Sequence, residues 1–323
     1  MKILGIWPEE RKYNQASSYL ILLPLSMMLL FIGIPQTIDL YFIWGDIDLT
    51  TENLSVGNMT VLLAIIKATI FWFSGESISV LLSNMEEDRK EANTEEETRR
   101  MMSIAKISRK ISIACTLTYD VLVILFVILH FLLVHYIGRI LIMRSYFPYN
   151  IQSTPNYELT VFAQTLAACC MGNAYTSVDT FLAMLVLHVC GQFENLGNQL
   201  RDLRRGNDNE FYIKLVKIVK KHDSLNRYTL VPKEEKKTLF FVYNSFAQKI
   251  SIKVADAAYE CKWYDLSPNE AKSLMIIMHR ARVPLCITAG KFSIFSHQLF
   301  TDILKTSMGY LSVLLAVNVV NTE

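Results

Sequence analysis

Charged side chains inside otherwise apolar segments are the first feature of this chain that could do chemistry. Asp179 interrupts an apolar stretch in the middle of the chain, and Asp302 with Lys305 interrupts another near the C-terminus. A charged group is costly inside a bilayer, and such side chains usually face protein or water. Each of them therefore indicates either a hydrogen bond between helices or a wet cavity, and the residue types leave both open.

The sequence has no arrangement of residues that is typical of an enzyme. It has no glycine-rich phosphate loop and no paired-histidine zinc motif. Its six cysteines form no CxxC pair, so we interpret them as small apolar side chains. The basic, aromatic-interleaved surface that binds nucleic acid is also lacking. We expect no catalysis, no cofactor, no metal and no nucleic-acid partner.

Apolar residues make up 52% of the 323 residues and are gathered in stretches of membrane length. A helix needs about 20 such residues to cross a bilayer. We expect five spans, over about 17–40, 57–82, 111–138, 159–193 and within 292–317. One further apolar stretch, 238–247, is too short to cross alone and is a partial span. The predicted fold class is all-α, a polytopic membrane helix bundle in the lipid bilayer.

The charges of the loops predict a cytoplasmic N-terminus. The loop from Asp39 to Asn58 carries only acidic charges, whereas the loop from Glu86 to Lys110 is rich in Lys and Arg. Because Lys and Arg are enriched in cytoplasmic loops, the first and third loops are expected to lie outside. Asn53 begins a glycosylation sequon in that first loop, and we expect it to carry a glycan.

Two predicted cytoplasmic segments carry signals for the start of a helix. Thr94 precedes three glutamates, which indicates an N-cap with acidic residues in the first turn. Ser267 is followed by Pro268 and then by Glu270, the pattern of a capping box. The apolar spacing on both sides of Ser267 predicts two amphipathic helices, which either pack between subunits or lie on the membrane surface.

Several strings in the chain resemble one known family. Residues 255–266 read ADAAYECKWYDL, residues 287–292 read ITAGKF and residues 304–307 read LKTS. Together they resemble the C-terminal signature of the insect odorant receptors. Residues 34–46 and 173–196 are similar to the same family, in particular to its members from ants, bees and wasps, so the resemblance covers nearly the whole chain.

The resemblance implies a fold and a function. Members of the family have seven helices with the N-terminus inside, and they assemble with a shared co-receptor into a hetero-tetrameric, ligand-gated, non-selective cation channel. This chain would be the tuning subunit in the plasma membrane of an olfactory sensory neuron, where it binds a small volatile ligand. Residues 1–247 would form the membrane bundle with a pocket in its outer half. Residues 248–323 would form cytoplasmic anchor helices and the pore-lining last span.

The resemblance also suggests site residues. For the ligand pocket, the candidate positions are Ile66, Ile70, Phe126, His130, Phe131, Thr165, Cys169 and Met171. For the pore gate they are Val313 and Val317, which are four residues apart and share one helix face. A hydrophobic constriction of this kind can gate by dewetting. Packing in the core or against lipid is the alternative at every one of these positions.

One region departs from the family pattern. After Tyr228 the family continues with a fifth span and most of a sixth, whereas residues 229–237 here read TLVPKEEKK and only 238–247 remain of the sixth. Losing two crossings preserves the orientation of everything that follows, but it removes a wall of the pocket. The alternatives are therefore a truncated, non-functional receptor copy, or a transporter-like or structural membrane protein, although we find no inverted repeats with broken helices.

Overall fold

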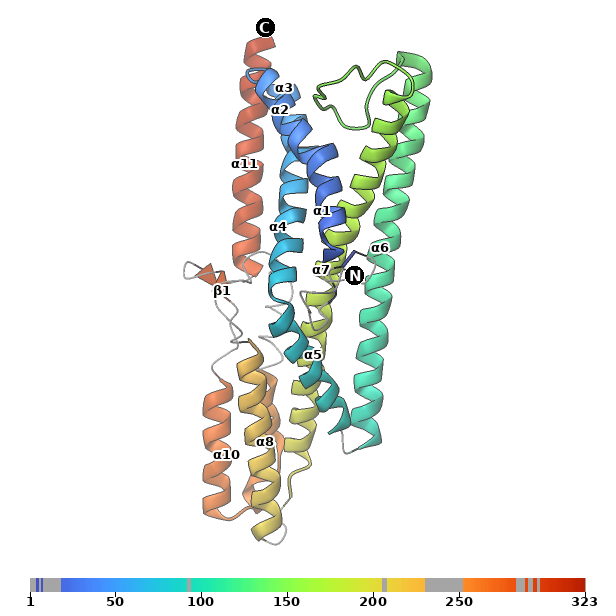
Figure 1. The fold of residues 1–323 in the computed structure, drawn as a ribbon. Coiled ribbons are helices and arrows are strands. Elements are labelled where there is room, and N and C mark those ends of the chain that lie inside the picture. Colours follow the sequence, from blue (N-terminus) through green and yellow to red (C-terminus); the bar gives the residue numbers. More distant parts are fainter. Residues whose placement is uncertain are drawn as a thin grey trace. The chain divides into compact units, whose positions relative to one another are not determined.

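Most of the residues that the computed structural model describes lie in helices, as Figure 1 shows. The structure describes residues 4–5, 7, 19–91, 94–204, 208–229, 252–282, 288–289, 293–294 and 297–322. The predicted partial span 238–247 lies outside these residues. The chain divides into two compact units, Met1–Glu91 with Lys106–Phe181 and Ala92–Ala105 with Leu182–Glu323.

The first unit begins with two helices that each contain a π-helical turn. The first is continuous over α1 (Leu22–Met28), η2 (Leu29–Gly33) and α2 (Ile34–Phe42). Pro35 explains the wider turn before it, because proline has no N–H to donate and its ring crowds the carbonyl one turn earlier. The second helix runs over α3 (Ile47–Glu52), η3 (Asn53–Asn58) and α4 (Met59–Phe73).

Three further helices follow, and two of them extend from one unit into the other. After Ser74 the chain continues in α5 (Gly75–Lys90), α6 (Glu95–Ile137) and α7 (Asn156–Arg201). The predicted helix start at Thr94 is confirmed, since the backbone N–H of Glu97 donates to its Oγ1 at 3.3 Å. α6 and α7 are each much longer than a bilayer requires, and their two parts belong to different units.

Four helices in the described part of the chain are long and apolar enough to cross a membrane. They are Leu22–Phe42, Ile47–Phe73, Glu95–Ile137 and Asn156–Arg201. They correspond to the first four predicted spans, but the second starts earlier and ends sooner than the predicted 57–82, because the helix is interrupted at Ser74. The fifth predicted span forms α11 (His297–Thr322), which is not among these four, so its crossing of the membrane stays a prediction.

The core of the first unit lies where α1, η2, α4 and α7 meet the loop of residues 138–155. Ala64 on α4 and Ala167 on α7 are fully buried, and small residues of this kind allow helices to approach closely. Gly57 serves the same purpose, because a Cβ there would overlap the side-chain amide of Gln36. The other buried apolar residues are Met28, Ile32, Val61, Ile142, Met143, Tyr157, Val161, Ala168 and Met171.

The second unit has a core of its own, made by the end of α7, α8 (Asp208–Thr229), a helix over residues 252–260 and α10 (Pro268–Ala281). The predicted capping box at Ser267 is confirmed, and its backbone N–H donates to Glu270 Oε2 at 2.8 Å. A 3-10 turn, η4 (Trp263–Asp265), precedes α10, and two short antiparallel strands, β1 (Thr288–Ala289) and β2 (Ser293–Ile294), precede α11.

His222 is a buried titratable group in this second core. It lies on α8 with 8% of its surface exposed, and its ring is 6.3 Å from that of Phe193. Burial, and then the positive charge of Arg280, lowers its pKa below the ordinary value, whereas Asp223 acts in the opposite direction. The folded protein therefore holds this imidazole neutral more strongly than the unfolded chain does.

This depressed pKa predicts a loss of stability in mild acid. Below about pH 6.5 the unfolded chain binds more protons at His222 than the folded one does. The free energy of unfolding therefore decreases as the pH is lowered through this range. Thermal unfolding of the detergent-solubilised protein should show the melting temperature dropping from pH 7.5 to 5.5. The drop should be smaller in His222→Gln, and identical pH profiles for the two proteins would contradict this account.

Candidate functional site

The first unit contains a cavity of about 900 Å³ among its helices. A volume of this size is within the range of about 300–1,000 Å³ that is usual for small-molecule sites. Its walls come from α4, α6, the 138–155 loop and α7. The lining residues are Thr60, Leu63, Ala114, Cys115, Thr118, Tyr119, Leu122, Val123, Phe126, Val127, Ile142, Met143, Thr165, Ala168, Met171, Gly172, Tyr175 and Thr176.

The cavity is apolar with a few hydroxyl groups. Thr60 Oγ1 donates to Gly57 O at 2.8 Å and Thr165 Oγ1 donates to Val161 O at 2.8 Å, each within its own helix. These hydroxyl protons are already used, but the oxygen of Thr165 can still accept a hydrogen bond. The lining residues include no charged side chain. Such a cavity suits a neutral, largely apolar molecule with one or two polar atoms.

Contacts between α6 and α7 fix one wall of the cavity. Tyr119 donates its phenolic proton to Ala168 O at 3.0 Å, and the ring packs so closely on Gly172 that a Cβ there would overlap it. One residue further along each helix, Asn173 Nδ2 donates to Asp120 Oδ1 at 3.0 Å. The two helices are therefore held at a fixed separation, which the absence of a side chain at Gly172 makes possible.

The 138–155 loop forms another part of the wall through Ile142 and Met143. Gln164 on α7 is fully buried and holds this loop with its side-chain amide. Its Nε2 donates to Met143 O at 3.1 Å, and its Oε1 accepts from Met143 N at 3.3 Å. The amide thus occupies both backbone groups of one loop residue and fixes the loop against the helix.

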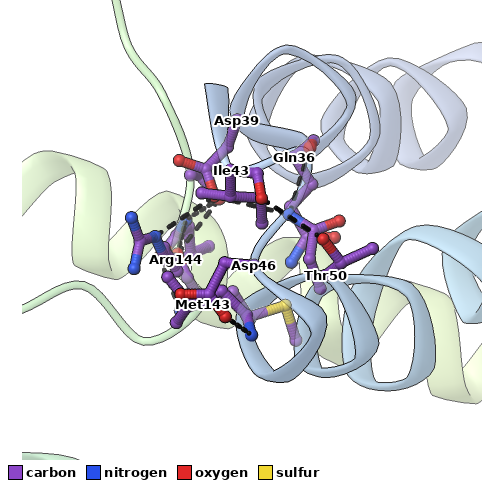
Figure 2. A network of polar contacts seen from close by, with 11 residues as sticks. Gln36, Asp39, Ile43, Asp46, Thr50, Met143 and Arg144 are labelled. Atoms are coloured by element: carbon purple, nitrogen blue, oxygen red, sulfur yellow. Dashed lines mark hydrogen bonds and ion pairs between the residues drawn. The ribbon is translucent and has the colours of Figure 1, made fainter. Parts of the chain in front are cut away.

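A polar network ties the same loop to α2, as Figure 2 shows. Arg144 from the loop forms an ion pair with Asp39, with 3.4 Å between Nε and Oδ2. Asn53 Nδ2 donates to Gln36 O at 3.1 Å and to the same Asp39 oxygen at 3.5 Å. The backbone N–H of Tyr146 also donates to Pro35 O at 3.1 Å. The loop is therefore anchored from two sides, by α7 and by α2.

The comparison with known families agrees with this geometry. The family model described as 7tm Odorant receptor matches residues 49–234 and 239–308, which is most of the chain. The chain belongs to this family of odorant receptors. The resemblance seen in the sequence is confirmed.

The individual proteins that match this chain share only a small part of its sequence. Odorant receptor 13a of Drosophila melanogaster is 24% identical over 237 residues, which cover 54% of this chain and 57% of that protein. The matched part therefore spans less than two thirds of the curated relative. Two structures of the olfactory receptor OR5 from Machilis hrabei, one in complex with eugenol, each match with a TM-score of 0.75. They share 16% identity over 98% of this chain and 95% of theirs, which establishes the fold as a polytopic membrane helix bundle.

The cavity of this odorant receptor family member brings together some of the predicted ligand residues. Phe126, Thr165 and Met171 line it, and the other five predicted positions do not. His130 is buried outside the lining, with Nε2 3.5 Å from the hydroxyl of Tyr157. Cys169 is half-buried on α7, also outside the lining. That any of these residues binds a ligand stays a prediction.

Three of the five predicted ligand residues that do not line the cavity lie on the surface of the protein. Ile66 and Ile70 on α4 are 42% and 39% exposed, and Phe131 on α6 is 58% exposed. These side chains do not point into the cavity. The family resemblance placed these residues on helices that contribute to the cavity, but it did not say which face each helix turns toward the cavity.

The other predicted sites are not among the residues that line the cavity. Val313 on α11 is 60% exposed, whereas the side chain of Val317 lies outside the described part of the chain. The pore gate therefore stays a prediction. Glycosylation of Asn53 also stays a prediction, and the structure argues against it, because this side chain is 5% exposed and its nitrogen donates both hydrogen bonds described above.

Sequence reasoning missed several residues that shape the cavity. Tyr119, Gly172 and Tyr175 all line it, and Gln164 holds its loop. Gln164 did carry a signal, because an amide inside an apolar span needs a partner. Nothing in the spacing of the tyrosines distinguished them from ordinary core residues.

The contact of Gly172 with Tyr119 predicts that Gly172→Ala is destabilising. The added methyl must displace the ring, and overpacking of this kind costs about 1–3 kcal/mol. Thermal unfolding of the solubilised protein should therefore show a lower melting temperature. Gly309→Ala is the control, since the space around Gly309 is open and alanine is the better helix former. Equal melting temperatures for Gly172→Ala and the unmodified protein would contradict the packing described here.

The hydrogen bonds of Gln164 predict that its side chain protects the 138–155 loop from hydrogen–deuterium exchange. Gln164→Leu leaves the buried N–H and C=O of Met143 without these partners, at a cost of about 1–3 kcal/mol for a buried polar group. Hydrogen–deuterium exchange across residues 138–155 should become faster. The same substitution at Gln199, which bonds to Glu97 in the second unit, should leave exchange in the loop unchanged. Unaltered exchange in Gln164→Leu would show that other contacts hold the loop.

Proposed function

We propose that this chain is an odorant-binding receptor subunit that forms a ligand-gated, non-selective cation channel with a co-receptor. The observation that carries the proposal is the apolar cavity of about 900 Å³ inside a bundle of the odorant receptor family. The proposed place of action is the plasma membrane of an olfactory sensory neuron. The chain would act as a receptor and not as an enzyme.

The chemistry of the cavity supports a small volatile ligand. An aromatic ring of the size of a Phe side chain buries about 150–250 Å². At about 25 cal/mol per Å² this burial stabilises the complex by about 4–6 kcal/mol. Because association also costs translational and rotational freedom, the dissociation constant should be no lower than about tens of micromolar. A receptor of this kind binds weakly and reversibly, as the sampling of a vapour requires.

The eugenol complex of the Machilis hrabei receptor gives a starting point for the ligand panel. We propose that a neutral molecule with an aromatic ring and one or two oxygen atoms also suits this chain. The hydroxyl oxygen of Thr165 could accept a hydrogen bond from such a ligand. A protonated amine or a carboxylate would enter the cavity without a counter-charge from its lining, at a large desolvation cost.

The test is the odorant-evoked current of the chain expressed with a co-receptor of the same family. A broad panel of neutral volatiles should contain activators of the unmodified pair. Val123→Trp should abolish the response or raise the half-maximal concentration about tenfold or more, because the indole occupies cavity volume that a ligand otherwise fills. Leu125→Trp is the matched control, since Leu125 lies two residues away on α6 with 56% of its surface exposed.

Two results would contradict the proposal. The first is an unchanged response in Val123→Trp, which would place ligand binding elsewhere. The second is the absence of any current from the unmodified pair, combined with a current once a fifth span from a family member is inserted after residue 228. That second result would identify the chain as a truncated, non-functional receptor copy.

A further inference from the structure

A buried ion pair joins two helices of the first unit beside the cavity. Lys67 on α4 has 6% of its side chain exposed, and Asp179 on α7 has 28%. Lys67 Nζ lies 3.1 Å from one carboxylate oxygen of Asp179 and 3.4 Å from the other. The charged side chains on these two apolar helices are therefore paired with each other.

The stability of the helix bundle alone does not require this pair. Removing one partner leaves a buried, uncompensated charge and is strongly destabilising. Replacing both partners by apolar residues of similar volume is often neutral or even stabilising. The pair therefore allows a clean experiment, because both charges can be removed together without unfolding the protein.

The ammonium group of Lys67 has a second partner, the ring of Tyr175. Nζ lies 3.3 Å from the ring centroid, which is a cation–π contact. Tyr175 precedes Asp179 by one helical turn, so both side chains lie on the same face of α7. The carboxylate fixes the position of the cation, and the cation fixes the position of the ring.

The ring is also the member of this cluster that a ligand would touch. Tyr175 lines the cavity, whereas Lys67 and Asp179 are not among its lining residues. Tyr119 and Phe126 contribute two further aromatic rings to the same cavity. A flat aromatic molecule could therefore pack against aromatic walls in the offset or edge-to-face arrangements that such rings prefer.

We propose that Lys67 and Asp179 are positioning residues that set the ligand selectivity of the cavity through Tyr175. This inference rests on the proposed function. The ion pair holds the cation on the ring, which makes the ring a rigid wall and draws its π electrons toward the ammonium group. A wall of that kind favours neutral, electron-rich aromatic ligands, such as aryl ethers, over saturated rings of the same size.

The experiment compares anisole with methoxycyclohexane, which has the same heavy-atom skeleton without the aromatic ring. Each is titrated into the detergent-purified complex of the chain with its co-receptor, and binding is read from the rise in melting temperature. The unmodified complex should bind anisole more tightly. In Lys67→Met/Asp179→Leu this preference should fall roughly three- to tenfold, because the cation–π contact is lost.

Three variants separate selectivity from folding. Lys67→Arg should retain the preference, since a guanidinium group can both pair with a carboxylate and stack on an aromatic ring. Tyr175→Phe should retain it as well, because the ring remains. Tyr175→Leu should lose it while the ion pair stays intact. The ligand-free melting temperature of the double variant should remain close to that of the unmodified complex.

The outcomes distinguish this inference from the proposed function. If the unmodified complex prefers anisole and the double variant keeps the same preference, this inference is overturned and the proposed function stands. A preference that is lost in Lys67→Arg, although the cation remains, would overturn it too. If neither probe nor any member of the volatile panel stabilises the unmodified complex, the proposed function fails, and this inference fails with it.

Discussion

The ion pair between Lys67 and Asp179 joins α4 to α7 in a part of the protein that is otherwise apolar. In such surroundings a charge without a partner is very costly, so these two helices can pack only in an arrangement that brings the two side chains together. The same requirement applies to weaker polar groups. Asn173 donates a hydrogen bond to Asp120, and Gln164 donates one to the backbone of Met143. These pairings fix the relative positions of α4, α6, α7 and the 138–155 loop.

The cavity is a consequence of these fixed positions. Between the polar contacts, the cavity is lined by aliphatic and sulfur-containing side chains, alanines, threonines, a glycine and a few aromatic rings, which leave about 900 Å³ unfilled. The polar groups that hold the helices are satisfied by one another, so the cavity itself offers an apolar surface with scattered hydroxyl oxygens. Most of the side chains that hold the helices do not line the cavity, but Tyr119 and Tyr175 do both.

The helices of this protein could largely be predicted from its sequence, and the cavity could not. Hydrophobic stretches, helix starts at Thr94 and Ser267, and the family strings each depend on residues close together in the chain. The lining of the cavity depends on how each helix is rotated, which the long-range polar pairs determine. Without those pairs, Ile66 and Ile70 looked equivalent to Phe126, although only Phe126 lines the cavity.

Asp179 is another residue whose surroundings could be predicted from the sequence only in part. Its place in an apolar span indicated a partner or a wet cavity, and the structure supplies a partner, Lys67. Both charges were visible in the sequence, but no local pattern connects residues that are 112 positions apart. The partner could be named only once the two helices had been placed side by side.

The most direct test of the central claim is a cryo-electron microscopy structure of the chain with its co-receptor, bound to a brominated analogue of the volatile that stabilises the complex most. This account predicts ligand density, marked by the bromine atom, inside the cavity between α4, α6 and α7 and in contact with Tyr175. Ligand density at another site, with this cavity occupied by lipid or by side chains, would contradict it.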